Sequence, residues 1–157
     1  MRYFETSSTT KRNKNWITIS ELEKIMNQSF SPSPAHIMIV DDNKMMRSFL
    51  NSFLTKKGYR VSTAVDGIQA LNQLRKGNYP DLIITDIRMP GLDGMEFLDR
   101  LKASPLLGEI PVIILSGQDS SESRITCLEK GAVDVLTKPF NPMELDLRLK
   151  RHMRVLA

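Results

Sequence analysis

The sequence predicts an α/β fold in which helices cover both faces of a five-stranded parallel sheet. From His36 onward, short apolar runs alternate five times with amphipathic segments of helical period. The apolar runs lack a regular polar alternation, which is typical of strands buried on both faces of a parallel sheet. Right-handed crossovers between such strands leave few topologies for the sheet, which we expect to be doubly wound.

Two strands and two helices are expected between residues 36 and 77. HIMIV (36–40) is a short apolar strand, and RVSTA (60–64) is a weaker one. The segment 43–58 has helical spacing and Gly58 placed to end it, and its apolar positions are Met46, Leu50, Phe53 and Leu54. The segment 66–77 is an amphipathic helix closed by Gly77, with Ile68, Leu71 and Leu74 on one side.

Three strands and three helices are expected between residues 81 and 157. The strands are DLIITD (81–86), IPVIILS (110–116) and VDVLT (133–137). A helix at 93–104 begins after Asp93, a favoured N-cap, and a helix at 120–131 ends at Gly131. The last helix, at 141–157, has Asn141 at its N-cap and Pro142 in its first turn, where the missing N–H costs nothing.

Residues 1–35 differ from the rest and are expected to form an N-terminal extension, partly disordered, to a domain at 36–157. Ser, Thr, Asn and charged residues dominate up to Trp16, and residues 17–30 predict a short helix. Ser20 with Glu23 matches a capping box, and the apolar stripe comprises Leu22, Ile25 and Met26. SPSP (31–34) predicts an extended linker. The extension is either a mobile tail or a helix that docks on the domain, on a second copy or on a partner.

Composition narrows the class of protein. The chain has 157 residues, of which 41% are hydrophobic, and its single Cys127 fits a reducing cytosol and a buried helical position. No apolar run approaches the ~20 residues that span a bilayer, and the N-terminus is too polar for a signal peptide. We therefore expect a cytoplasmic protein without membrane contact. The net charge of +4 is spread along the chain without an aromatic platform, so no direct nucleic-acid binding is expected.

Polar residues collect where the expected strands end. Asp41 and Asp42 follow the first strand, Asp86 ends the third, and Ser116 and Lys138 follow the fourth and fifth. Because parallel strands bring their carboxyl ends to one rim, these side chains should meet there. Three clustered carboxylates repel one another, a hard cation such as Mg²⁺ relieves this, and Lys138 adds a fixed positive charge. Such a site can hold a phosphoryl group on a carboxylate.

Each of these residues has a simpler explanation when taken alone. Asp41 or Asp42 is a suitable helix N-cap, and Asp86 a suitable start for a turn through Pro90. Ser116 is equally suited to cap the next helix, and Lys138 to lie solvated in a loop. Their shared placement at one rim favours a functional site over four independent structural roles.

The same residues carry a resemblance to a known family. IVDDN (39–43), IITDIRMPGLDG (83–94), ILSG (114–117) and GAVDVLTKPF (131–140) resemble the response-regulator receiver domain of two-component signalling, over residues 36–155. The resemblance implies a flavodoxin-like (βα)5 fold with strand order 2-1-3-4-5, and a cis bond before Pro139. It also implies a signalling phosphoacceptor rather than an enzyme.

The resemblance further implies a role for each site residue. Asp86 would be the phosphoacceptor, Asp42 a direct Mg²⁺ ligand, and Asp41 an acidic partner acting through water. The backbone carbonyl of Arg88 would be another ligand, Ser116 would contact the phosphoryl group, and Lys138 would pair with it. The phosphodonor would be a sensor histidine kinase, a histidine phosphotransfer protein or a small molecule.

This chain departs from the family pattern at three positions. Val135 stands where the family commonly has an aromatic switch residue, and a valine cannot carry a ring between two rotamers. Signal transfer would then use the loop after the fourth strand or the following helix. Arg88 and Gln118 occupy positions that tune hydrolysis in the family, and they predict no particular lifetime. A phosphorylation-independent binding module and the front part of a longer regulator therefore stay open as alternatives.

Two other readings are disfavoured. A haloacid-dehalogenase-type phosphatase needs a second carboxylate two residues after Asp86, but Arg88 stands there. A flavin-binding protein is also disfavoured, because Asp41 and Asp42 would repel the phosphate of the flavin. We expect signalling through protein contact, at the face made by 120–131, 133–137 and 141–157, and a homodimer is left open.

That output face is predicted from the spacing of its last helix. Apolar residues are expected to pack inward at Leu145, Leu149 and Met153. Arginines are then left for an acidic partner or for solvent at Arg148, Arg151 and Arg154.

Overall fold

A computed structural model of the chain describes residues 16–29, 33–117 and 121–153. The chain divides into two units, Met1–Ser33 and Pro34–Ala157. The predictions for Gln118, Arg154, the first half of the SPSP linker and the polar segment before Trp16 lie outside the described residues. No helix among the described residues is both long and apolar enough to cross a bilayer.

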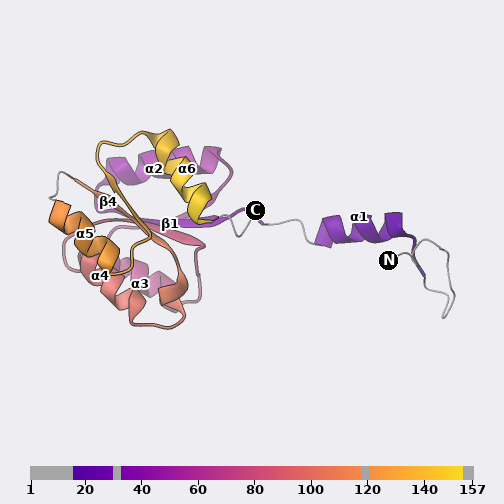
Figure 1. The fold of residues 1–157 in the computed structure, drawn as a ribbon, viewed down its shortest axis with the longest axis horizontal. Coiled ribbons are helices and arrows are strands. Elements are labelled where there is room, and N and C mark those ends of the chain that lie inside the picture. The colour runs from indigo at the N-terminus through magenta and orange to yellow at the C-terminus, as the bar shows by residue number, and fades with distance from the viewer. Residues whose placement is uncertain (1–15, 30–32, 118–120, 154–157) are drawn as a thin grey trace. The chain divides into compact units, whose positions relative to one another are not determined.

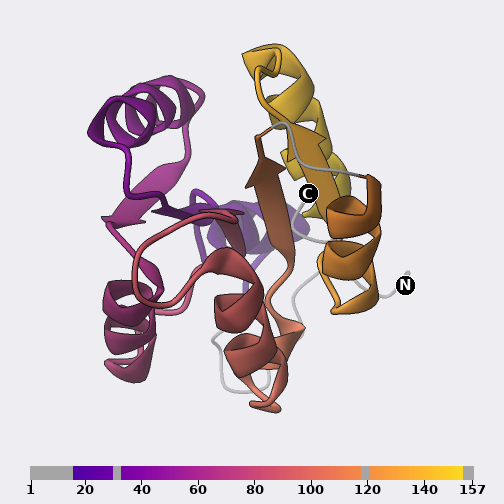
Figure 2. The ribbon, with the colours of Figure 1, turned by 90° about the vertical axis from the view of Figure 1, so that its left-hand side faces the viewer.

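The larger unit is built on a five-stranded parallel sheet (Figure 2). Its strands are β1 (His36–Val40), β2 (Arg60–Ala64), β3 (Leu82–Asp86), β4 (Val112–Ser116) and β5 (Asp134–Thr137). The spatial order is β2-β1-β3-β4-β5, which confirms the predicted topology. Val40 pairs with Ala64 on one side and with Thr85 on the other, so β3 extends one residue beyond the end of β1.

Helices cover both faces of this sheet (Figure 1). One face carries α2 (Lys44–Lys56) and α6 (Pro142–His152). The other carries α3 (Gly67–Arg75), α4 (Gly94–Lys102) and α5 (Ser121–Glu129), and the 3₁₀ helix η2 (Leu107–Glu109) follows α4. This arrangement confirms the doubly wound α/β class.

The alternation of side chains along each strand divides the apolar interior into two cores. In β1, Met38 and Val40 belong to the core under α3 and α4, whereas Ile37 and Ile39 belong to the core under α2 and α6. In β3, Ile83 faces the first core and its neighbours face the second. Both faces of the central strands are fully buried, so their sequences show no polar alternation.

Helix ends follow the signals read from the sequence. Asp93 forms a capping box at the start of α4, and Asn141 caps α6 with Pro142 in the first turn. After α2, Gly58 adopts φ +99°, and the N–H groups of Gly58 and Tyr59 donate to the carbonyls of Thr55 and Leu54. This Schellman arrangement needs a left-handed residue, which explains the glycine.

Two details of the helices differ from the prediction. The N-terminal helix α1 (Ile19–Ser29) lies inside the predicted range 17–30, but it begins two residues before the start that a cap at Ser20 would give. Thr18 and Glu21 make the reciprocal cap bonds predicted for Ser20 and Glu23. The S/T-x-x-E pattern occurs twice in this segment, and the first copy is used. In α3, Ile68 is half exposed because the buried stripe passes through Ala70 and Leu74 instead.

The expected output face is only partly as predicted. Leu145, Leu149 and Met153 are buried, which confirms the inward stripe, and Cys127 is buried in α5. Arg148 is not free for a partner, however. Its guanidinium lies 2.6 Å from the Asp134 carboxylate and 2.7 Å from that of Glu144. The sequence hid this pairing because Asp134 lies on a strand, 14 residues away.

Candidate functional site

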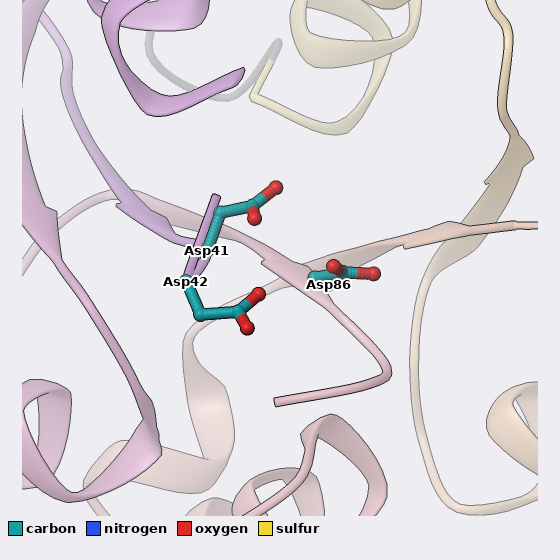
Figure 3. Close-up of side chains that lie close together, drawn as sticks. All are labelled: Asp41, Asp42 and Asp86. Atoms are coloured by element: carbon teal, nitrogen blue, oxygen red, sulfur yellow. The ribbon is translucent and has the colours of Figure 1, made fainter. Parts of the chain in front are cut away.

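The candidate site lies at the carboxyl ends of β1 and β3, two neighbouring strands at the centre of the sheet. Asp41 and Asp42 directly follow β1, and Asp86 is the last residue of β3. Figure 3 shows the three carboxylates, which come from these two strands. One oxygen from each lies within 4.8 Å of the others, so the structure brings together the three predicted acidic residues.

Asp41 is the most enclosed of the three carboxylates, with only 1% of its side chain exposed. Its Oδ1 accepts a hydrogen bond from the Asn43 N–H at 2.8 Å, while its buried Oδ2 has no hydrogen-bond donor within the part of the chain that the structure describes. Burial raises the pKa of Asp41, the Asn43 hydrogen bond and Lys138 offset part of this, and the charges of Asp86 and Asp42 add to it. The ionised form of Asp41 is therefore only partly stabilised by Asn43 and Lys138.

Lys138 supplies the positive charge that lies closest to the acidic residues. Its Nζ is 3.3 Å from Asp86 Oδ2 and 3.5 Å from Asp41 Oδ2. The Lys138 N–H donates to the Ser116 carbonyl at 2.6 Å, which fixes the start of the loop after β5. A cis peptide bond joins Lys138 to Pro139, as the resemblance implies. Lys138 bridges two carboxylates and is not a solvated loop lysine.

Asp86 is held by its own loop yet remains accessible to solvent. Its Oδ1 accepts from the Ile87 N–H at 2.8 Å, and 13% of its side chain is exposed. The loop then turns back so closely that Gly94 packs against the Asp86 carbonyl, and the Gly94 N–H donates to Ile87 O at 2.6 Å. Only a glycine leaves room for this approach.

Two further predicted residues lie at the same rim. Ser116 is buried at the end of β4, and its Oγ donates to the Gly117 carbonyl at 3.1 Å. Arg88 is exposed and lines an open depression beside Asp42, together with Met89, Pro90 and Asp93. The simpler explanation of Asp41 or Asp42 as a helix N-cap does not hold, because Asn43 caps α2 by accepting from the Met46 N–H.

Comparison with known proteins decides the family. The model of the response regulator receiver domain matches residues 37–150. The chain belongs to this family. It is a signalling phosphoacceptor domain and not a conventional enzyme, as the sequence predicts.

Related sequences and structures agree with this assignment. The receiver is 37% identical over 121 residues to the response regulator MprA of Mycobacterium sp. (strain KMS), covering 77% of this chain and 51% of that protein. It is 38% identical to the phosphate regulon transcriptional regulatory protein PhoB of Escherichia coli (strain K12), with 77% and 52% covered. The chain thus spans about half the length of the curated relatives it matches.

Among solved structures, a putative response regulator from Chloroflexus aurantiacus J-10-fl has 37% identity and a TM-score of 0.73. That match covers 77% of this chain and 98% of the other. The chemotaxis protein CheY4 of Vibrio cholerae has 34% identity and a TM-score of 0.70, with 75% and 98% covered.

The acidic residues of the receiver fit a divalent cation. Among the described residues no hydrogen-bond donor reaches the buried Asp41 Oδ2, and one oxygen from each of the three carboxylates lies within 4.8 Å of the others, beside Lys138. Oxygen ligands of this kind suit Mg²⁺. The cluster is consistent with the metal site of a receiver.

Sequence reasoning missed three residues that build the site. Asn43 supplies the N–H that holds Asp41, Arg47 donates from its Nη1 to the Asp41 carbonyl at 2.8 Å, and Gly94 permits the tight turn after Asp86. Asn43 and Gly94 stand inside the matched motifs, so their positions were a usable signal. Arg47 is one polar residue on a helix and gave no such signal.

Proposed function

We propose that this receiver accepts a phosphoryl group on Asp86 from a phosphohistidine of a sensor kinase or histidine phosphotransfer protein. A carboxylate oxygen of Asp86 forms a bond to phosphorus while the bond from phosphorus to the donor nitrogen breaks. The leaving imidazole keeps the electron pair and takes a proton from solvent. The observation that carries this proposal is the cluster of three carboxylates with Lys138 3.3 Å from Asp86.

Asp41, Asp42, Asp86 and the Arg88 carbonyl would hold Mg²⁺. When bound, Mg²⁺ supplies positive charge that offsets the charge on the phosphoryl oxygens. Lys138 would pair with one of these oxygens, and the Ser116 hydroxyl would donate to another after leaving the Gly117 carbonyl. The open depression beside Asp42 would give the donor access from solvent.

Intact-mass measurement tests the proposal directly. The full chain is incubated with acetyl phosphate and Mg²⁺, and Asp86→Asn is treated in parallel. We expect a gain of one phosphoryl group in the native chain only. If the native chain does not gain mass although it binds Mg²⁺, the phosphorylation-independent binding module is the better description. Val135, which is buried in the core beneath α5, favours that alternative.

Domain boundaries and output are part of the same proposal. We take residues 36–157 as the receiver and 1–35 as an extension, so a chain lacking residues 1–30 should still be phosphorylated. Loss of folding on this deletion would contradict the boundary. A second candidate is the front part of a longer regulator, favoured by the half-length coverage of the curated relatives. The coding sequence beyond the codon for Ala157 tests it.

The output surface we propose is the face formed by α5, β5 and α6. On α5, Ile125 and Leu128 are about half exposed one helical turn apart, whereas Arg148 is already paired within the chain. An apolar contact at α5 is therefore favoured over an acidic partner for the arginine. We expect Leu128→Glu to abolish the cellular response while phosphorylation in vitro is unchanged. Loss of phosphorylation in this variant would instead indicate damage to the fold.

A further inference from the structure

Arg47 makes a polar contact beside the acidic residues, and the proposed phosphoryl transfer does not use it. It lies in the first turn of α2, and its side chain is only partly exposed. Its Nη1 donates to the main-chain oxygen of Asp41 at 2.8 Å, and its own N–H donates to Asn43 O at 3.0 Å. The guanidinium therefore contacts the peptide group that joins the two adjacent acidic residues.

That peptide group orients the main chain of Asp42 and with it the Cα–Cβ bond that carries the carboxylate. The preceding Asp41 N–H is fixed by the Ala64 carbonyl of β2 at 3.1 Å, and the Asp41 side chain is fixed by Asn43. The Asp42 carboxylate, in contrast, is exposed. The peptide plane between residues 41 and 42 sets the Cα–Cβ bond from which this carboxylate extends, and Arg47 holds the oxygen of that plane.

The contact that Arg47 makes is with the main chain, whereas the Asp41 carboxylate is held by other groups. The Asn43 N–H donates to Asp41 Oδ1 at 2.8 Å, and Lys138 Nζ lies 3.5 Å from Asp41 Oδ2. We infer that Arg47 is a positioning residue, which fixes the Asp41–Asp42 peptide plane and thereby aims the Asp42 carboxylate at the cation site. This inference rests on the proposed function for its meaning, because it assumes that Asp42 binds Mg²⁺.

The test compares three variants of the full chain. Arg47→Met keeps most of the side-chain stem and removes the donor, whereas Arg47→Lys keeps a donor. Arg75→Met is the matched control, because Arg75 also donates one hydrogen bond, to Asn72 at 3.1 Å, but does so on the exposed surface of α3. Each methionine variant removes one positive charge, so a general charge effect would appear in both.

Three measurements are made on each variant. Mg²⁺ affinity is measured by calorimetry, the Asp42 amide chemical shift is recorded without metal, and the thermal midpoint is recorded without metal. We expect Arg47→Met to weaken Mg²⁺ binding by roughly 10-fold, as removal of groups that orient a metal ligand commonly does. The metal-free Asp42 amide signal should move, Arg47→Lys should recover part of the affinity, and Arg75→Met should match the native chain.

Other outcomes separate this inference from the proposed function. If Arg47→Met is folded and binds Mg²⁺ within about a factor of two of the native chain, the positioning role is wrong. A lower thermal midpoint with unchanged affinity would also overturn it, because that is the signature of a purely structural contact. If the native chain itself binds no Mg²⁺, the proposed function fails. Independently of metal, an Asp42 amide signal that does not move in Arg47→Met would refute the claim that Arg47 fixes the peptide plane.

Discussion

Gly94→Ala should destabilise the receiver, because the position has no room for a methyl group. A Cβ added there would lie 2.8 Å from the Ile87 Cα and closer still to the Asp86 carbonyl oxygen. The carbon–carbon contact is roughly 0.7 Å shorter than an ordinary one of about 3.5 Å. Both contacts are with backbone, which cannot rotate away as a side chain can, so the loop after β3 must shift.

The expected loss follows from two opposing effects. Overpacking of a buried position costs about 1–3 kcal/mol. The better helix propensity of alanine offsets up to about 1 kcal/mol of this. We expect the free energy of unfolding to fall by about 1–2 kcal/mol, which leaves a folded protein if the receiver has an ordinary stability of about 5–15 kcal/mol. Because the shift displaces Asp86, phosphorylation by acetyl phosphate should also slow.

Urea denaturation measures this loss, and Gly108→Ala is the control. A methyl group at Gly108, in η2, meets its nearest atoms at 3.4 Å or beyond, so its cost should stay within about 0.5 kcal/mol. For Gly94→Ala, the urea midpoint should fall by roughly 1 M at an unchanged m-value. Equal midpoints for the native chain and both variants would refute the steric argument, and with it the account of how Asp86 is positioned.

Three further predictions concern protonation and ion pairing. Burial raises the pKa of Asp41, and cation binding needs the ionised carboxylate. As the pH is lowered, Mg²⁺ affinity should therefore begin to fall at a higher pH than it would for an ordinary aspartate. Calorimetry across the acidic range measures this, and an affinity that stayed constant down to about pH 4 would contradict it. Burial lowers the pKa of His36, so the unfolded state takes up the proton first and the free energy of unfolding falls as pH drops below about 6.5. This pH dependence should be absent from His36→Gln. Equal pH profiles of stability for the native chain and the variant, measured by urea denaturation, would rule out the contribution of His36. Arg148→Met removes partly exposed ion pairs to Asp134 and Glu144, so the free energy of unfolding should fall by less than about 1 kcal/mol, and this loss should become smaller as salt is added. A larger loss that does not depend on salt would mean that packing of the Arg148 side chain matters more than its charge.

The strands and the acidic site could be predicted because their signals are local in sequence. Each buried strand is a short apolar run, and a carboxylate that directly follows such a run must lie at the rim of a parallel sheet. Asp41 and Asp86 are 45 residues apart in sequence, yet the neighbouring positions of β1 and β3 place them together. The family resemblance supplied the strand order, which periodicity alone left open.

The remaining features depend on tertiary contacts that periodicity does not encode. A helical pattern shows that Arg148 lies off the apolar stripe, but only the packed structure places Asp134 beside it. Similarly, the buried Asp146 accepts from the Tyr59 hydroxyl at 2.9 Å, which joins the end of α2 to α6 across 87 residues. Two S/T-x-x-E patterns, starting at Thr18 and Ser20, compete for one helix start, and the pattern does not rank them.

The order of the strands gives the pocket one rigid side and one compliant side. Asp41 directly follows β1 and Asp86 ends β3, and both strands are hydrogen-bonded to neighbours on both edges. Lys138 follows β5, which pairs in the described sheet with β4 alone. Local opening of a native protein begins where fewest neighbours must be released. The amides of β5 should therefore exchange well before those of β1 and β3. When an anion binds, Lys138 and its loop should shift to accommodate it, while Asp41 and Asp86 keep their positions.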